Sequence, residues 1–481
     1  MQQPGVQERQ QRHRIVVPSR SDRLLKEMTE LVGGPMGRRA APGIVSPGFF
    51  TVERVLILMA LASAIVAFFG KFHCQESGWT TPDQYSTVCW SQFPNIFVDS
   101  QLSSNFPFFS ANGTFSFPPL TGLIAGVTAW LVGGAGTLAA QQLAFFDLNA
   151  ALIGVAWLAT VAAVARSARR RPWDAAIVAA SPALLLTAYV SWDFWAAALV
   201  SVGILLFARR RTLWAGLVIG LAATIAPYAL LVLFVLLVLA VRGGQAVRAI
   251  ETIAAAAVGW LAVVGPVLLV NPAQWGKYLS RVFTATPSDS SIYGSYNLVA
   301  QRVGLVQVSG GTVNGAVFVL LLVLLLAVVW LGLAAPRRPR VAQLAFLAVA
   351  GLTLIDKSAQ PWHGVWLLPL LALAHPRWRT MLLWQATVIA HFIALMLFQS
   401  THLGDISPQH SIDMPYFVFA VLLNMVATLA VMILVVRDVL TPEYDVVRRK
   451  GVDDPQGGIL DGTPDHVAIG RGRLAGERAR G

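Results

Sequence analysis

Charged residues are scarce in this 481-residue chain: Asp, Glu, Lys and Arg together make up 12%, whereas apolar residues make up 56%. Soluble domains carry about twice that share of charge, which excludes an ordinary globular protein. The apolar residues stand in continuous runs of about 17–25, the length of a helix that crosses a bilayer. Membrane barrels alternate apolar and polar residues instead. The sequence therefore predicts an all-α polytopic membrane protein.

The positive charge is unevenly placed along the chain. A formal net charge of +12 would by itself suggest nucleic-acid binding. Most basic residues, however, stand at the chain ends and in short connections such as 169–171, 209–211 and 337–340. The topology leaves five on the outer side of the membrane: Lys71, Lys277, Arg281, Arg302 and Lys357. This is the positive-inside pattern, so the charge indicates orientation and contact with anionic lipid, and no nucleic-acid partner is expected.

Residues 1–48 lack the apolar segment of a signal peptide. We expect 1–48 to be a basic cytoplasmic extension, 49–436 to form the transmembrane domain, and 437–481 to be a disordered cytoplasmic tail. Two polar outer loops, 71–118 and 271–312, interrupt the transmembrane domain. Both termini then lie on the cytoplasmic side of the plasma membrane.

The apolar segments predict about twelve crossings, with two irregular places. Segments 119–134 and 143–164 cannot both cross, because 169–171 would then lie outside; we expect 119–134 to be re-entrant or interfacial. The run 212–241 contains Pro227, which predicts two short helices that meet at the outer face. The other predicted membrane segments are 52–70, 174–190, 193–208, 249–270, 315–334, 341–355, 364–375, 380–398 and 415–436.

Cysteine is almost absent, and both cysteines, Cys74 and Cys89, fall in the first outer loop. An oxidising exterior favours a disulfide between them; two free buried thiols are the alternative. His73 beside Cys74 lacks the further ligands that a zinc site needs. A glycine-rich nucleotide loop is also missing. We therefore expect no metal and no cofactor.

The predicted topology brings polar groups from distant segments to the outer face. Transfer of a sugar from a lipid-linked phosphate needs a carboxylate base, cations or hydrogen-bond donors for the leaving phosphate, and aromatic walls. The outer face supplies carboxylates at Glu76, Asp83 and Asp99, cations at Lys277, Arg281, Arg302 and Lys357, and rings at Trp79, Trp90, Trp192, Trp275 and Trp362.

These residues, and other polar residues predicted at the outer face, also have simpler interpretations. Tryptophans at this depth commonly form the interfacial belt of a membrane protein. Arg281 can extend towards headgroups, and Asp356 can simply neutralise Lys357. His363 fits an interfacial histidine, and Asp193 fits a residue that caps a helix.

Four stretches, taken in order, resemble a known family: CWSQFPNIF at 89–97, FSFPPLTGLIAG at 115–126, the run 191–227 from SWDFW to TIAP, and DKSAQPWHGVWLLPLLALAHPRWR at 356–379. The chain resembles the GT-C membrane glycosyltransferases, and among them glycosyltransferase family 87, which includes actinobacterial mannosyltransferases that use polyprenol-phosphate-mannose. The resemblance implies a helical bundle whose long first outer loop covers the site. It also implies transfer of mannose or a related pentose from a polyprenyl-phosphate carrier to a cell-envelope glycolipid or glycan.

The chain departs from the family pattern at several positions, and two of them bear directly on the expected chemistry. Gln92 stands where the resemblance leads us to expect an acid, and an amide cannot serve as a base. Ile225 stands where a lysine is expected, while Lys357, Pro361 and Trp366 match the pattern. The general scaffold is therefore retained, and part of the expected site is not.

Two interpretations follow from these departures, and a third is weaker. In the first, the protein is an active hexosyltransferase whose base has moved to Asp99, or else to Asp83, with His363 assisting. The residues expected to bind the substrate and its phosphate are Lys357, Arg281, Asp193, Gln92 and Trp362. In the second, a non-catalytic member binds polyprenyl phosphate or partner enzymes. A lipid flippase or transporter fits less well, because charges within the spans are nearly absent.

Overall fold

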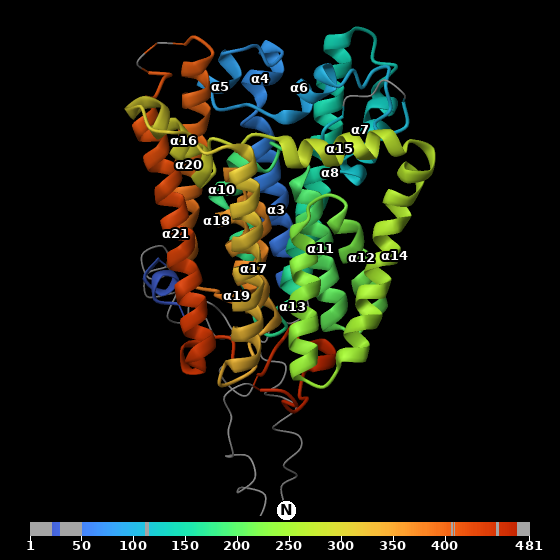
Figure 1. Cartoon of the computed structure of the whole chain (residues 1–481), viewed down its shortest axis with the longest axis vertical. Helices are drawn as coiled ribbons and strands as arrows, with labels where there is room; N and C mark the ends of the chain where they lie inside the picture. Colours follow the sequence, from blue (N-terminus) through green and yellow to red (C-terminus); the bar gives the residue numbers. More distant parts are fainter. Residues whose placement is uncertain are drawn as a thin grey trace, which may run out of the picture.

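The structure, a computed structural model, describes residues 22–28, 51–110, 115–405, 407, 409–448 and 452–468. Over these residues every regular element is a helix. Figure 1 shows most helices side by side in one bundle, with the connections gathered at two ends. We call the end that carries α4 (Phe72–Ser77), α5 (Asp83–Ser86) and α6 (Gln92–Asp99) the loop end. The opposite end, where residues 441–468 lie, is the tail end.

Six helical segments are long and apolar enough to cross a bilayer: Val52–Ser77, Leu138–Ser167, Ala246–Val270, Gly310–Ala334, Trp378–His402 and Met414–Leu440. They correspond to α3 (Val52–Phe69) together with α4, and to α8, α14, α17, α20 and α21. Helices α14 and α17 bury few side chains, 28% and 17% of the residues in their most apolar stretch. That exposure suits a lipid-facing position and supports a membrane protein.

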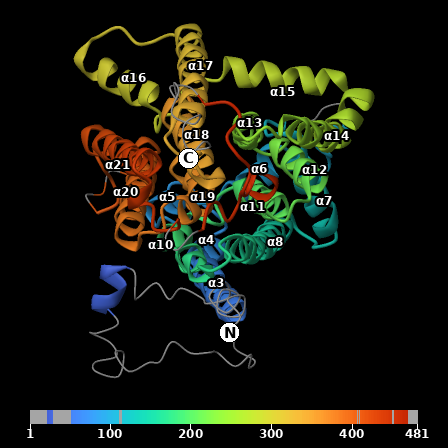
Figure 2. The ribbon, with the colours of Figure 1, turned by 90° about the horizontal axis from the view of Figure 1, so that it is seen from below.

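The bundle also contains shorter apolar helices: α11 (Asp193–Ala208), α12 (Thr212–Ala223), α13 (Tyr228–Arg242), α18 (Val341–Ile355) and α19 (Gly364–Ala374). Seen from the tail end, α20 and α21 form a pair on one side and α11, α12 and α14 a group on the other, with α18 and α19 between them (Figure 2). Helices α18 and α19 are almost wholly buried, so they form the core that joins the two groups.

Helix α7 (Pro119–Val132) has the length of a re-entrant helix. Its 14 residues rise about 21 Å, less than the ~30 Å hydrocarbon core. It starts beside the break between α12 and α13, where Leu120 N donates to Thr224 O. From there it rises towards the loop end, where α8 begins (Figure 1). Five other apolar helices also have only 10–17 residues, so helix length does not test whether α7 crosses, and its re-entrant path stays a prediction.

The break at Pro227 is also as predicted, since α12 ends at Ala223 and α13 begins at Tyr228. By contrast, the predicted span 174–190 is not one helix but three short ones: η2 (Pro172–Ala175), α9 (Ala176–Ala179) and α10 (Pro182–Thr187). Ser181 caps α10 and donates its hydroxyl to Gln385 Oε1. Pro182 lacks the N–H that a continuous helix needs, so the helix is interrupted here.

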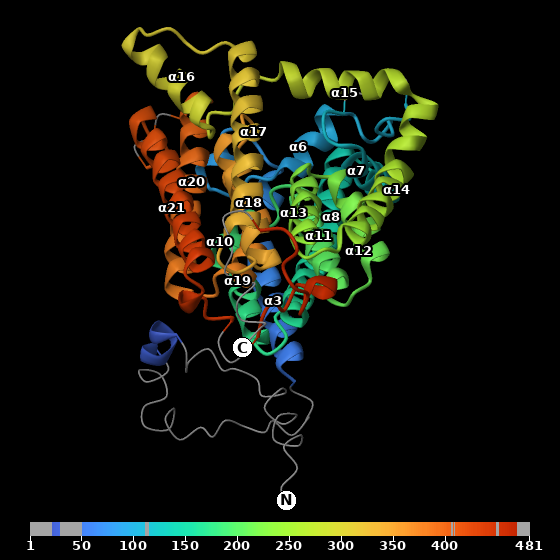
Figure 3. The same cartoon turned by 60° about the horizontal axis from the view of Figure 1, so that its bottom comes forward.

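The predicted outer loop 271–312 contains two helices, α15 (Pro272–Thr284) and α16 (Ile292–Val303). Figure 3 shows α15 lying across the loop end, roughly at right angles to α17, and α16 on the other side of α17. Trp275 and Tyr278 of α15 pack against the bundle, while Val282 and Phe283 are exposed. The short segment 285–291 between the two helices carries part of the site described below.

Over its described part, the segment 437–481 differs from the disordered tail that we expected. Helix α21 continues to Leu440, and residues 441–448 and 452–468 pack on the tail end of the bundle. Asp445 is 1% exposed and pairs with Arg340, which is fully buried. Arg242 likewise pairs with Asp465. These arginines at the helix ends hold the segment in place. Residues 22–28 of the predicted extension 1–48 are described, and Asp22 Oδ2 accepts a hydrogen bond from Trp378 N. The rest of the segment for which a cytoplasmic extension is predicted lies outside the described residues.

Candidate functional site

The first loop is fastened to the bundle at several points. Cys74 and Cys89 form a disulfide. Gln92 N donates to Val190 O and Ser91 Oγ to Tyr189 O. Lys71 links Trp90 to the bundle, because its Nζ donates to the carbonyl of Trp90 and to that of Leu186. The loop therefore forms a fixed cover over the elements beneath it.

A cavity of 530 Å³ lies under this cover, and we call it the outer cavity. Pockets of this size hold small ligands. It is lined by the first loop at Tyr85, Trp90 and Gln92, by the segment before α16 at Thr286, Pro287, Ser288 and Asp289, by Ser358, Gln360 and Trp362, and by α20 at Leu395, Met396 and Gln399. Among these described residues the only carboxylate is Asp289, and none is lysine or arginine.

Aromatic rings form one side of the outer cavity. Trp90 packs against Trp362 with ring centroids 5.4 Å apart, and Tyr85 stacks on Trp90 at 5.9 Å. Amides and hydroxyls stand around these rings, at Gln92 and Ser358 among others. Apolar ring faces beside hydrogen-bonding groups are suited to a sugar, which has both apolar C–H faces and hydroxyls.

Asp289 stands on a segment that many contacts hold. Ser288 N donates to Lys357 O, Gln360 Nε2 donates to Ser288 Oγ, and Ser295 Oγ donates to the carbonyl of Asp289. Burial raises the pKa of the Asp289 carboxyl above its ordinary value, and the nearby His402 opposes that shift. A half-buried carboxylate on a fixed backbone, with a raised pKa, suits a general base.

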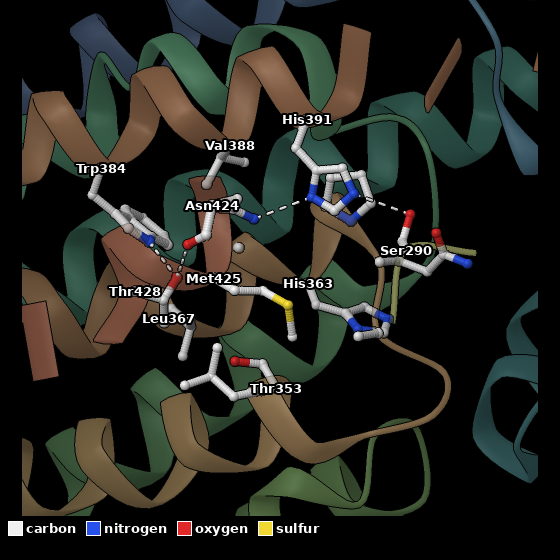
Figure 4. Close-up of a pocket in the computed structure, with 15 residues that line it drawn as sticks. Ser290, Thr353, His363, Leu367, Trp384, Val388, His391, Asn424, Met425 and Thr428 are labelled. Atoms are coloured by element: carbon white, nitrogen blue, oxygen red, sulfur yellow. Dashed lines mark hydrogen bonds between the residues drawn. The ribbon is translucent and has the colours of Figure 1, made fainter. Parts of the chain in front are cut away.

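A smaller inner pocket adjoins the outer cavity at Gln360 (Figure 4). Asn424 Nδ2 donates to His391 Nδ1, which leaves the proton on Nε2 to be donated to Ser290 Oγ. At 40 Å³ the pocket holds about one water molecule. It is therefore too small for a sugar, and its hydrogen bonds fix Ser290, the residue after Asp289.

Four of the predicted site residues lie in or near these two cavities. Gln92 and Trp362 line the outer cavity, and His363 lines the inner pocket. His363 stacks on Trp366 at 4.0 Å, and Trp366 Nε1 donates to Asp193 Oδ1. Asp193 begins α11 and also accepts a hydrogen bond from Ser191, so the structure places it beside the inner pocket without lining either cavity.

The other predicted residues lie elsewhere. Asp99 is exposed at the end of α6, and Asp83 pairs with His73 on the outer surface. Arg281 donates to Phe115 O and Ser116 Oγ. Lys357 is 7% exposed. Its Nζ donates to three acceptors: Phe283 O, Ala285 O and Asn314 Oδ1. None of these four side chains lines the outer cavity.

Sequence reasoning missed Asp289. The residue stands in TPSDSSIYG, a polar stretch without a flanking motif. A usable signal was present, because Ser291 is a helix cap. A cap there would have placed an acid on a short, fixed turn between two amphipathic helices. Over the described residues there is no cluster of three His, Cys, Asp or Glu side chains that could hold a metal ion.

The fold and the outer cavity define a helical membrane protein with a polar, aromatic-walled site at one end. A model of glycosyltransferase family 87 matches residues 115–356, half of the chain. The chain belongs to this family. No curated protein and no solved structure matches it. The matched range includes Asp289 and ends at Asp356, immediately before Lys357.

Proposed function

We propose that this protein is a glycosyltransferase that moves a sugar, mannose (as a hexosyltransferase) or a related pentose, from a polyprenyl-phosphate carrier to a cell-envelope glycolipid or glycan. The observation that supports it most is the outer cavity, which combines one fixed carboxylate with a tryptophan wall and uncharged hydrogen-bonding groups in a chain of family 87. The donor serves as substrate, and the proposal needs no cofactor or metal.

The proposed site faces the outside of the plasma membrane, with both termini in the cytoplasm. Arginine-rich connections gather at the tail end, at residues 169–171, 209–211 and 337–340. Such residues are retained on the cytoplasmic side during insertion. The disulfide at the loop end also suits an oxidising exterior. We therefore propose that the loop end is extracytoplasmic.

In the proposed reaction, Asp289 takes the proton of an acceptor hydroxyl while that oxygen bonds to the sugar C1. The bond between C1 and the phosphate oxygen breaks, and polyprenyl phosphate leaves with the electron pair. The raised pKa of Asp289 brings its basicity closer to the operating pH. Asp99 and Asp83, the bases proposed from the sequence, stand outside the cavity.

Hydrogen-bond donors of the outer cavity would hold the leaving phosphate. Gln92 and Ser358 present an amide and a hydroxyl there. Lys357 adjoins Ser358 in the chain, and its ammonium is occupied by three acceptors. In this proposal Lys357 supports the phosphate through its charge and through the segment that it holds. Leu395 and Met396 provide an apolar wall for the start of the prenyl chain.

The test compares three carboxylates in purified membranes that receive radiolabelled polyprenyl-phosphate mannose or arabinose. Asp289→Asn should lower the rate of glycolipid formation by about 10²–10⁴, as expected for loss of a general base. Asp99→Asn and Asp83→Asn are matched controls on the same face and should retain the activity. Full activity in Asp289→Asn, with loss of activity in Asp99→Asn, would contradict Asp289 as the base and identify Asp99 of the first loop instead.

The second candidate is a non-catalytic member that binds polyprenyl phosphate or partner enzymes. It is favoured by Gln92, which occupies the cavity at the position where an acid was expected. This candidate predicts that a photo-crosslinkable polyprenyl phosphate labels the protein while no sugar is transferred. It also predicts that Gln92→Asp creates turnover in an otherwise inert protein.

A further inference from the structure

A second cavity of 460 Å³ lies beside the outer cavity, between the segment before α16, α16 itself and the turn before α17. We call it the side cavity. Its polar lining consists of Thr284, Thr286, Asp289, Asn297, Gln301 and Gln307. The two cavities share Thr286, Pro287 and Asp289. Asp289 is therefore reached from both sides.

Local packing builds the side cavity. Asn297 of α16 accepts a hydrogen bond from Val308 N and donates one to Val308 O, which fixes the turn before α17 as the far wall. On the near wall, Gly294 has no side chain, so the backbone of Ser288 and Asp289 lies directly on α16. Both walls are thus set by contacts within the chain, which leaves the space between them open.

The chemistry of the lining selects a class of ligand. Hydroxyls and amides bind the hydroxyls of a polyol as donors and acceptors. The amides of Gln301 and Gln307 have no hydrogen-bond partner in the part of the chain that the structure describes, so both are available to a ligand. Among the described lining residues none is lysine or arginine, and Arg302 on the same helix is paired with Asp413. An anionic headgroup would find hydrogen-bond donors there but no cationic side chain to balance its charge.

We propose that the side cavity is the acceptor subsite and binds an uncharged, polyhydroxylated ring, such as the end of a neutral glycolipid. The proposal rests on the function proposed above. With the donor sugar in the outer cavity and the acceptor in the side cavity, one acceptor hydroxyl meets the Asp289 carboxylate at their shared wall. The acceptor oxygen then bonds to the donor C1 as its proton passes to Asp289, and polyprenyl phosphate leaves.

The experiment uses the full chain in lipid nanodiscs with polyprenyl-phosphate mannose or arabinose as donor. Octyl α-mannoside serves as the uncharged acceptor and phosphatidylinositol as the anionic one. Transfer to octyl mannoside is expected. Gln301→Leu and Gln307→Leu should each raise the KM for octyl mannoside about three- to tenfold, the effect of one lost neutral hydrogen bond, and leave the KM for the donor unchanged.

Gln399→Leu is the matched substitution in the outer cavity. It should raise the KM for the donor and leave that for octyl mannoside unchanged, because Gln399 lines the outer cavity alone. An unchanged acceptor KM in both Gln301→Leu and Gln307→Leu overturns the proposal. So does transfer to phosphatidylinositol in place of octyl mannoside.

A binding measurement separates this proposal from the proposed function. A mannoside that carries a diazirine should label the peptide 284–310, and Gln301→Leu should reduce that labelling, whether or not sugar is transferred. Labelling without transfer would contradict the proposed function and leave the subsite standing. Transfer with labelling confined to other peptides would support the proposed function and contradict the side cavity as the acceptor subsite.

Discussion

Gly294 of α16 lies directly against the backbone of Asp289. A Cβ placed on Gly294 would stand 2.8 Å from Asp289 Cα and would overlap the carbonyl group of Ser288. These are backbone atoms, which cannot turn aside as a side-chain tip can. The absence of a side chain at one residue of α16 thus sets the position of the carboxylate shared by both cavities.

Gly294→Ala should therefore lower glycosyl transfer about a hundredfold, because a displacement near 1 Å at a catalytic group has an effect of that order. Alanine favours the helix over glycine, so the substitution acts through the contact with Ser288 and Asp289 and not through helix propensity. Gly276→Ala in α15 is the matched control, since no atom lies within 4 Å of its added Cβ. Equal activity in the two variants would contradict the assigned role of Asp289.

The pH profile of transfer offers a second test of Asp289. A base must be ionised, so activity is present above the pKa of the carboxyl and is lost as the pH falls through it. Burial raises this pKa, and His402 partly opposes the shift. The acid limb of kcat/KM should therefore lie above the ordinary value for aspartate, about 3.9. His402→Gln should move the limb to higher pH, since it removes the opposing charge. A limb that stays in place in His402→Gln would count against Asp289.

Much of the helical framework could be predicted from sequence, because apolar length and proline positions are local signals. Pro227 separated α12 from α13 as expected. The interruption at Ser181 was missed. Its hydroxyl donates to Gln385, more than two hundred residues away in the chain, and no local sequence pattern indicates such a partner.

The site was harder to predict for the same physical reason. Its residues come together through tertiary contacts, so a polar loop residue such as Asp289 carries no mark of its own burial. Of the carboxylates predicted from the first loop, Asp99 is exposed, and Asp83 is partly exposed and pairs with His73. Lys357 was singled out as a phosphate contact, and nothing in its neighbourhood in sequence indicates that two backbone carbonyls occupy its ammonium.

Lys357→Met tests whether this lysine holds the segment before α16. The substitution removes the donor to Phe283 O, Ala285 O and Asn314 Oδ1. Hydrogen bonds from a charged group are worth about 2 kcal/mol each, so amide exchange in 284–291 should quicken about thirtyfold or more. Lys277→Met, on the exposed side of α15, should leave exchange unchanged. Labelling by a photo-crosslinkable polyprenyl phosphate should weaken but persist in Lys357→Met; its complete loss would instead indicate a direct phosphate contact.

The disulfide between Cys74 and Cys89 should stabilise the cover of the outer cavity. The two cysteines are separated by 15 residues, and closing a loop of that length is worth about 3 kcal/mol. The double variant Cys74→Ser with Cys89→Ser should show faster proteolysis within 74–110 and weaker donor binding. Dithiothreitol should reproduce this in the wild type and add nothing in the double variant. Unchanged proteolysis and donor binding in the reduced wild type would contradict this stabilising role of the disulfide.

The pair Arg340–Asp445 should hold residues 441–448 to the tail end of the bundle. Arg340 Nε donates to Asp445 Oδ2 at 2.8 Å, and both side chains are almost fully buried. Removing one partner of such a pair leaves a buried charge alone and costs about 3–5 kcal/mol. Asp445→Asn should therefore lower the unfolding temperature of the detergent-solubilised protein. Glu251→Gln is the matched control, because its pair with Arg248 is exposed and worth less than about 1 kcal/mol.

The pH dependence of this stabilisation has a defined sign. Burial alone would raise the pKa of the Asp445 carboxyl. The Arg340 guanidinium lowers this pKa by more than burial raises it, so the net pKa lies below the ordinary value. The stabilisation is then complete above the pKa of the unfolded chain and is lost as the pH falls through the lowered pKa. The difference in unfolding temperature between wild type and Asp445→Asn should be constant from pH 7 to about 5 and shrink only below about pH 4. A difference that already shrinks between pH 7 and 5 would show that Asp445 is not held ionised by Arg340.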